Sequence, residues 1–291
     1  MAVSDIQPGM VGEGLTVVTG TEPQSFKVEV IGVIPDGIGA GRDMVMIEVS
    51  DLPNQNVIGA NGIWAGMSGS PVYVDGKLLG AISYGFTWSA SPIGGLTPAS
   101  DMIDLLNAPN AGQAKAKGAA KDKVTLSASQ RKAAETRATA AIPRSLEKLP
   151  TPVSVSGLSN KRLASLQKTF DKSGRSFIAY RGASAGKPVR SAAAPTAPVP
   201  GGNFAAVQIY GDLSVAGVGT TTAVCGNKVL AFGHPMDFAG KVSYGANHAS
   251  SLQIINDQGN GSFKMANVGD NFGIVDQDRM AAIRATIGNG P

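Results

Sequence analysis

Two residue types that often carry catalysis or stability are scarce in this sequence. Among 291 residues there is one cysteine, Cys225, and there are two histidines, His234 and His248. A single cysteine excludes a disulfide within the chain. The three residues also lack Cys-x-x-Cys and His-x-x-x-His spacing, so the sequence offers no zinc site. No run reaches the roughly 18 apolar residues of a membrane-spanning helix, which predicts that no helix crosses a membrane.

Helical periodicity is also scarce in both terminal thirds of the chain. Short apolar runs alternate with polar residues and are separated by turn residues, among them many of the 38 glycines. The patterns predict strands within 15–18, 26–34 and 44–49, a turn at 35–37 and a hairpin over 72–84. We therefore expect an all-β fold with one barrel over 1–106, closed by a short helix at 97–106, and a second barrel over 203–291.

The middle of the chain, residues 107–202, is predicted to be a flexible linker with one or two helices. From 107 to 149 it is basic and contributes much of the sequence pI of about 9.1. A nucleic-acid or cell-surface patch would use this charge, but the lack of interleaved aromatic residues favours a solvated linker with a frayed helix. Apolar residues at helical spacing predict a helix over 158–170, and prolines indicate an extended tether over 184–202.

Residues 66–71, Gly-Met-Ser-Gly-Ser-Pro, form the most informative motif. They precede a hairpin whose Asp75-Gly76 turn suits a two-residue type I′ connection. A serine between glycines can turn the backbone sharply and aim N–H groups at a substrate carbonyl. Ser68 is therefore the candidate nucleophile, with the N–H groups of Gly66 and Ser68 as the oxyanion hole. The alternative is an ordinary polar loop.

A serine nucleophile needs a base, and His234 is the better of the two histidines. It follows an apolar strand and stands between Gly233 and Pro235, so its ring can leave the sheet and enter a cleft. His248 lacks such a setting and is expected to be a polar loop or strand residue. Cys225 lies in a hairpin turn without a glycine-framed loop, which favours a small semi-buried residue over a thiol nucleophile.

Two segments carry a family resemblance. The serine motif with its Asp-Gly-Lys-Leu-Leu-Gly-Ala hairpin, and the run from Gly211-Asp212 to Gly233-His234, resemble the SpoIVB-type serine peptidases of the trypsin-like superfamily. The resemblance covers roughly residues 8–106 and 200–280 and implies two trypsin-like β-barrels with the active site between them. The order differs from the sporulation protease, because Ser68 precedes His234 here, and this resembles a circular permutation.

The resemblance also implies an acid that orients His234. In the sporulation relative an aspartate lies shortly before the serine motif, which points to Asp51. Ordinary trypsin-like topology takes the aspartate from the histidine barrel, which makes Asp278 the rival. Asp237 is so close to the histidine in sequence that we do not expect it to fold back onto the ring. A water or a backbone carbonyl is the remaining alternative.

These residues together predict a serine endopeptidase that works through an acyl-enzyme, without metal or organic cofactor. The expected partner is a protein or peptide substrate and not nucleic acid. The resemblance includes self-processing members, for which 107–149 and 184–202 offer accessible sites. The N-terminal residues show no signal peptide, which suits a cytoplasmic protein. The resemblance instead implies a secreted or cell-envelope exterior location, with the export signal absent from this sequence.

Two other classes of function compete with the peptidase. One is a protease-like module that binds peptides or envelope partners without turnover. The other, an α/β-hydrolase, does not fit, because Ser70 stands where that fold needs glycine and a hairpin follows the serine.

Overall fold

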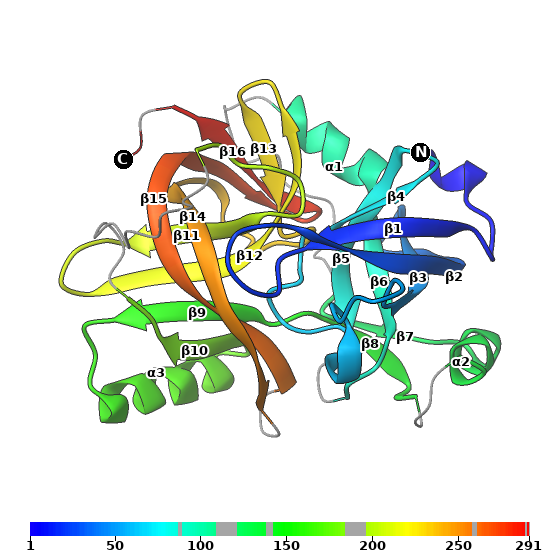
Figure 1. Ribbon diagram of the computed structural model, residues 1–291, viewed down its shortest axis with the longest axis horizontal. Helices are drawn as coiled ribbons and strands as arrows, with labels where there is room; N and C mark the ends of the chain where they lie inside the picture. The colour runs from blue at the N-terminus through cyan, green and yellow to red at the C-terminus, as the bar shows by residue number, and fades with distance from the viewer. Residues whose placement is uncertain are drawn as a thin grey trace.

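Two antiparallel β-barrels lie side by side in the computed structural model (Figure 1). The first, blue to cyan, carries the N-terminus, and the second, yellow to red, carries the C-terminus. The structure describes residues 1–86, 89–108, 121–137, 142–183, 196–257, 261–288 and 290. The predictions for 109–120, 138–141 and 184–195 lie outside these ranges. The predicted all-β class with two barrels is confirmed.

Six strands close the first barrel in the order β4-β1-β2-β3-β6-β5, with β4 and β5 also paired. The elements are η1 (Val3–Asp5), β1 (Val11–Thr16), β2 (Gln24–Gly39), β3 (Arg42–Ser50), η2 (Gly59–Asn61), β4 (Pro71–Val74), β5 (Lys77–Gly85), β6 (Ile93–Pro98) and α1 (Ala99–Leu106). The predicted turn at 35–37 is wrong. Asp36 has a left-handed φ of 52° inside β2, and the chain reverses only at Ala40 and Gly41, which leads into β3.

The hairpin that follows the serine motif forms with the predicted turn. Asp75 and Gly76 have φ values of 50° and 71°. Positive φ at both central residues is the type I′ geometry, whose twist matches that of the flanking strands. The turn therefore fixes the register between β4 and β5, the two strands that follow the nucleophile motif in the sequence.

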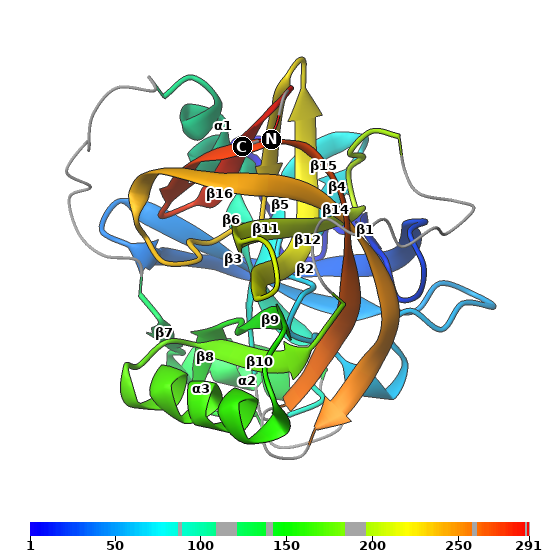
Figure 2. The ribbon, with the colours of Figure 1, turned by 90° about the vertical axis from the view of Figure 1, so that its left-hand side faces the viewer.

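The second barrel repeats the plan with the ring β12-β11-β14-β15-β16-β13, closed by the pairing of β12 with β13. Its strands are β11 (Asn203–Ile209), β12 (Ser214–Cys225), β13 (Lys228–Ala231), β14 (Gly240–Asp257), β15 (Gly261–Arg279) and β16 (Ala282–Ile287). Figure 2 shows β14 and β15 as a long curved pair that leaves this barrel and reaches beside β9 and β10.

The predicted linker is wrong for most of its described residues, because they add a strand–helix–strand unit to each barrel. The first unit comprises β7 (Lys123–Thr125), α2 (Ala128–Glu135) and β8 (Ser145–Lys148), and the second comprises β9 (Thr151–Ser156), α3 (Asn160–Lys172) and β10 (Phe177–Arg181). β8 pairs with β5, and β9 pairs with β12. Strands this short contribute few apolar residues, so the composition of the whole segment remains that of a linker.

The helix predicted over 158–170 forms as α3. The Ser159 side chain caps its first turn by accepting a hydrogen bond from the Arg162 N–H. Its apolar side chains pack against the core of the second barrel, as the spacing predicts; they are Leu163, Leu166 and Phe170.

Four basic side chains of the described residues between 121 and 148 are paired with acids. The ion pairs are Lys123–Glu147 at 3.0 Å, Arg131–Glu135 at 3.3 Å, Lys148–Asp122 at 2.6 Å, and Arg137 with Glu29 at 3.1 Å and Glu48 at 3.5 Å. Exposed pairs of this kind contribute at most about 1 kcal/mol each to stability. Their effect here is that the positive charges of these four side chains are neutralised by acids of the same protein.

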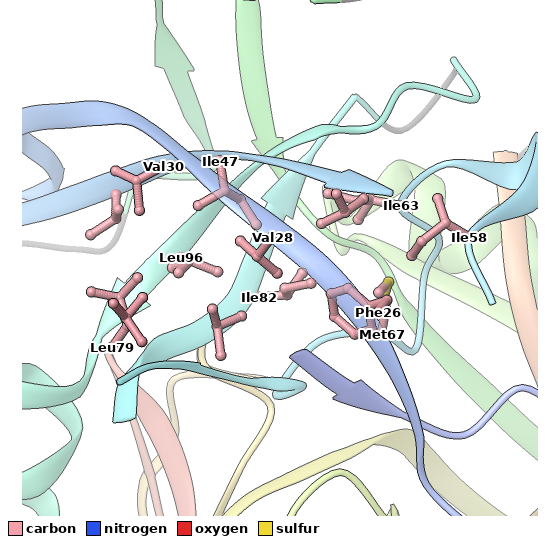
Figure 3. Packing of buried hydrophobic residues seen from close by; sticks show 14 of the residues in the cluster. Phe26, Val28, Val30, Ile47, Ile58, Ile63, Met67, Leu79, Ile82 and Leu96 are labelled. Carbon is pink, nitrogen blue, oxygen red and sulfur yellow. The ribbon is translucent and has the colours of Figure 1, made fainter. Parts of the chain in front are cut away.

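The core of the first barrel extends into the serine motif (Figure 3). Met67 is fully buried in the cluster that contains Phe26 and Ile63, and Trp64 is buried there as well. Burying a methionine side chain contributes about 1.5–3 kcal/mol. Hydrophobic packing on both sides of Gly66 therefore holds the loop that carries Ser68 in one position.

Candidate active site

The nucleophile loop, residues 66–71, lies against β12 of the second barrel. The Thr220 N–H donates to the Ser68 carbonyl at 2.9 Å, and the Thr220 hydroxyl donates to the Gly66 carbonyl at 3.0 Å. The Thr222 hydroxyl donates to the Gly69 carbonyl at 2.7 Å. Three buried hydrogen bonds thus fix the loop of one barrel to a strand of the other.

Glycine is required at position 69 by this close approach. Its φ is +96°, and an added Cβ would lie 2.1 Å from the Thr220 carbonyl oxygen and 2.5 Å from the Phe232 nitrogen. Both atoms belong to backbone, which cannot move aside. The glycine that follows Ser68 in the Gly-Met-Ser-Gly motif therefore serves the contact between the barrels as well as the turn.

On the other side of the loop, Gly66 and Ala65 lie against β15. The Lys264 N–H donates to the Ala65 carbonyl at 2.8 Å, and Gly66 has a φ of +92°. The Lys264 amine is buried and donates to the Asn203 side-chain oxygen at 2.9 Å. Burial lowers the pKa of Lys264 to about 7. A buried lysine behind the motif was not expected from the sequence.

Ser68 and His234 meet at the junction of the two barrels. The Ser68 hydroxyl and His234 Nε2 are 2.9 Å apart, and the two residues are only 2% and 1% exposed. The structure thus brings together the two residues that the sequence paired as nucleophile and base.

A strained turn delivers His234 to this position. Phe232 and Gly233 have φ values of 71° and 65° at the end of β13. A left-handed φ is unusual for a bulky residue, and such strain, of about 1–3 kcal/mol, persists where surrounding contacts enforce it. Those contacts are present: Phe232 is fully buried, and the Thr97 hydroxyl donates to the Gly233 carbonyl at 2.5 Å.

A backbone carbonyl orients the imidazole. His234 Nδ1 lies 2.8 Å from the carbonyl oxygen of Pro235. A carbonyl can only accept, so Nδ1 carries the proton and Nε2 presents its lone pair to the Ser68 hydroxyl. This is the tautomer that a general base requires.

The structure does not place Asp51 beside His234. Its carboxylate accepts from the N–H groups of Val57, Ile58 and Gly59 at 2.6, 2.7 and 2.9 Å, so it holds the loop before the serine motif together. The prediction of Asp51 as the orienting acid is corrected on this geometry. Asp237 also faces elsewhere, because its carboxylate accepts from Gln208 at 2.8 Å and pairs with Arg175 at 3.4 Å.

Asp278 supports the histidine indirectly. Its buried carboxylate accepts from the N–H groups of Met236, Asp237 and Ala239 at 2.9, 2.8 and 3.2 Å. Burial raises the pKa of Asp278, and these three hydrogen bonds oppose the increase. The residue therefore fixes the loop that begins at Pro235, whose carbonyl in turn fixes His234.

Asp278→Asn is expected to destabilise the protein by about 1–3 kcal/mol and to lower turnover, because an amide cannot accept all three hydrogen bonds and its NH₂ group opposes an N–H. Asp51→Asn is expected to cost similar stability while turnover per folded molecule stays within about threefold of wild type. Urea unfolding and peptide turnover measure both effects. Loss of turnover in folded Asp51→Asn, with Asp278→Asn unaffected, would reverse the two roles.

Burial sets the protonation state of the base. Burial, with a smaller contribution from the Lys148 charge, lowers the pKa of His234 to about 3, and the hydrogen bond to the Pro235 carbonyl works in the opposite direction. The imidazole is therefore neutral at physiological pH and able to accept a proton.

The two backbone N–H groups assigned to the oxyanion hole are free. Within the described ranges, neither the Gly66 N–H nor the Ser68 N–H has a hydrogen-bond acceptor. The next N–H groups in the loop are used, since that of Gly69 donates to Ile82 and that of Ser70 donates to Met67. The pair left free is the one that could stabilise a developing oxyanion.

The remaining candidates lie elsewhere. His248 is a strand residue of β14 whose ring packs on Phe272 at 4.8 Å, as expected for a polar strand position. Cys225 ends β12 at an exposed turn and is not the semi-buried residue that the sequence suggested. Among the described residues, His, Cys, Asp and Glu form no group of three that could hold a metal ion. None of the helices in the described ranges combines the length and apolarity needed to span a membrane.

The comparison with protein families finds a match that covers the first barrel. Residues 2–96 match the model of the family described as SpoIVB peptidase S55. The matched part contains the nucleophile loop and nearly all of the first barrel, and it ends before the segment that carries His234. No curated protein and no solved structure matches the chain. Through its first barrel, the chain therefore matches the SpoIVB peptidase S55 family.

Proposed function

We propose that the protein is a serine endopeptidase with Ser68 as nucleophile and His234 as general base. The observation that carries the proposal is the 2.9 Å contact between the Ser68 hydroxyl and His234 Nε2, beside two free backbone N–H groups. The match of residues 2–96 to a peptidase family supports the peptide bond as substrate.

The mechanism follows from the placement of these atoms. Ser68 Oγ attacks the substrate carbonyl carbon while His234 Nε2 takes the hydroxyl proton, and the N–H groups of Gly66 and Ser68 stabilise the negative oxygen. The carbon–nitrogen bond then breaks, and His234 gives its proton to the leaving amine. Water, activated by the same imidazole, hydrolyses the ester and regenerates the serine.

The Pro235 carbonyl does part of the work of a triad aspartate. It selects the correct tautomer of the imidazole. Loss of this role in a chymotrypsin-type enzyme lowers kcat by about 10⁴-fold. The carbonyl carries no full charge, so it stabilises the imidazolium less than a carboxylate would. We therefore propose a serine–histidine dyad with a backbone orienter.

A fluorophosphonate probe tests the proposal, because it labels only an activated serine. We expect covalent labelling that mass spectrometry assigns to Ser68, together with cleavage of unfolded protein substrates. The second candidate, a binding module without turnover, draws on the near-complete burial of Ser68 and His234. Peptide binding with no label on Ser68 in any variant would favour it.

The acid limb of the pH profile gives a further prediction. An unperturbed histidine base with a pKa near 6.5 would leave only about one thirtieth of kcat/KM at pH 5. With the pKa of His234 lowered to about 3, kcat/KM at pH 5 should stay within about twofold of its value at pH 7. A half-maximal rate between pH 6 and 7 would contradict this assignment.

The free energy of unfolding also depends on pH, so the pH profile needs a control for unfolding. Below about pH 6.5 the unfolded chain binds a proton at His234 that the folded chain does not bind until about pH 3. The free energy of unfolding therefore falls as the pH falls through this window. Circular dichroism at each pH separates loss of the base from loss of the fold.

The finer features belong to the same proposal. The family resemblance supports a secreted or envelope-exterior location, self-processing, and a circularly permuted order relative to the sporulation protease.

A further inference from the structure

β8 and the residue after it lie along the end of β5. β4 covers β5 only from Lys77 to Ala81, whereas Tyr84 and Gly85 pair antiparallel with Lys148 and Glu147 of β8. The chain continues this pairing for one residue beyond β8, where the Leu149 N–H donates to the Ser83 carbonyl at 3.0 Å. Addition of an extended segment to an open strand edge is a common way in which proteins bind peptides.

This edge leads directly to the nucleophile. Ile82, the neighbour of Ser83 in β5, accepts from the Gly69 N–H at 2.8 Å and donates to the Ser70 carbonyl at 3.0 Å. One stretch of β5 thus holds the nucleophile loop at Ile82 and the added segment at Ser83. Leu149 is consequently placed one strand position away from the loop that carries Ser68.

The Leu149 side chain fills an apolar pocket. It is 1% exposed and belongs to the core cluster of the first barrel. A Cβ added at Gly85 would lie 3.0 Å from Leu149 Cδ2 and 3.4 Å from Ile63 Cγ2. The missing side chain at Gly85 therefore makes the room that Leu149 occupies, with Ile63 beside it.

The chain then runs past the dyad. A Cβ added at Gly66 would lie 3.2 Å from Pro152 Cγ, so the chain at Pro152 reaches the loop that carries the oxyanion-hole N–H groups. Lys148 and Thr151 line a hollow of about 230 Å³ together with Pro235, the residue after His234. Between β8 and β9 the chain therefore crosses from one barrel to the other beside Ser68 and His234.

We propose that residues 145–149 occupy the peptide-binding edge of the active site as an internal stand-in for substrate, with Leu149 in the pocket for the residue whose carbonyl is attacked. This inference rests on the proposed peptidase function and deepens it in two ways. The segment shields the dyad, which explains the burial of Ser68 and His234, and the enzyme selects substrates with a leucine-like residue before the cleaved bond. Pro150 follows, so the corresponding bond in the chain is a proline imide, whose ring carbons crowd the amine side.

Labelling rates test the shielding. Leu149→Ala should be labelled by a fluorophosphonate at Ser68 about tenfold faster than wild type or more, because truncating a buried leucine weakens the hold of the segment on the cleft by at least that factor. Leu126→Ala is the matched control, since Leu126 is buried in the same added unit but in another core cluster. Circular dichroism confirms that both variants are folded.

Three outcomes are distinguishable. Faster labelling of Leu149→Ala alone supports the proposal. Equal labelling of wild type and Leu149→Ala, or equal acceleration by Leu126→Ala, overturns it and leaves the peptidase assignment intact. Absence of labelling in all three proteins removes the peptidase function itself.

A peptide series tests the pocket. Fluorogenic peptides that differ only in the residue before the cleaved bond should show kcat/KM for leucine about tenfold or more above alanine and further above aspartate and arginine, which would bury a charge there. The series is measured on Leu149→Ala as well as on wild type. Equal or higher rates for aspartate or arginine would contradict the assignment of the Leu149 pocket.

Discussion

Ser68→Ala is expected to reduce peptide turnover to background, a loss of about 10⁶-fold on the scale known for serine proteases. The hydroxyl is the only group at the dyad that can form the acyl-enzyme, and alanine keeps the backbone N–H groups that bind the oxyanion. Substrate binding should therefore survive while kcat collapses. Steady-state kinetics with a fluorogenic peptide, together with fluorophosphonate labelling, measure the effect.

Ser70 provides a control two residues away in the same motif. Its side chain is fully buried, and its hydroxyl has no hydrogen-bond partner in the described structure. Ser70→Ala thus removes no interaction and should keep turnover within about tenfold of wild type and stability unchanged or slightly higher. Full labelling of Ser68→Ala would show that the nucleophile has been misassigned.

His234→Gln is expected to slow acylation by about 10⁴-fold to 10⁶-fold, since the serine loses the base that takes its proton. Glutamine fills most of the volume of the buried imidazole, which limits the loss of packing against Phe232. Single-turnover labelling isolates the acylation step from later hydrolysis.

Two comparisons sharpen the histidine test. His248→Gln, in a strand position packed on Phe272, should change the rate by less than about tenfold. The double variant Ser68→Ala/His234→Gln should be no slower than Ser68→Ala, because residues that act as a unit are not additive. Equal losses for the two histidine variants would mean that the base has been misassigned.

The parts of the site that sequence could predict are those with local signals. A serine framed by glycines, an Asp-Gly turn and a histidine between glycine and proline each demand a particular backbone conformation. The positive φ values at Gly66, Gly69, Asp75 and Gly76 show that these demands are met. Ser68 and His234 could therefore be chosen without knowledge of the fold.

The orienting group could not be chosen in this way. A backbone carbonyl such as that of Pro235 has no side-chain signature, so the sequence indicates only aspartates for this role. Asp51 and Asp278 both bind three backbone N–H groups, and only the three-dimensional path of each loop reveals which one lies behind the histidine. Thr220 and Thr222 of β12, which clamp the nucleophile loop, are similarly visible only once the barrels are docked.

The small units inside the predicted linker lack a sequence signal for a different reason. β8 depends on β5 of the first barrel as its partner, β7 depends in turn on β8, and both strands are too short to show a period in the sequence. Leu149 is an example. In the sequence it is a single leucine in a basic stretch, and its burial follows only from its pairing with β5.

The order of the two barrels along the chain has a consequence for biosynthesis. Domains generally fold from the N-terminus as they leave the ribosome. All six strands of the first barrel lie within residues 11–98, so it can close before the second barrel has been translated. His234, its supporting Asp278 and strand β16 all belong to the second barrel, which is translated later. A nascent chain therefore carries the nucleophile without its base, and the proposed peptidase gains its catalytic pair only after the second barrel has been translated.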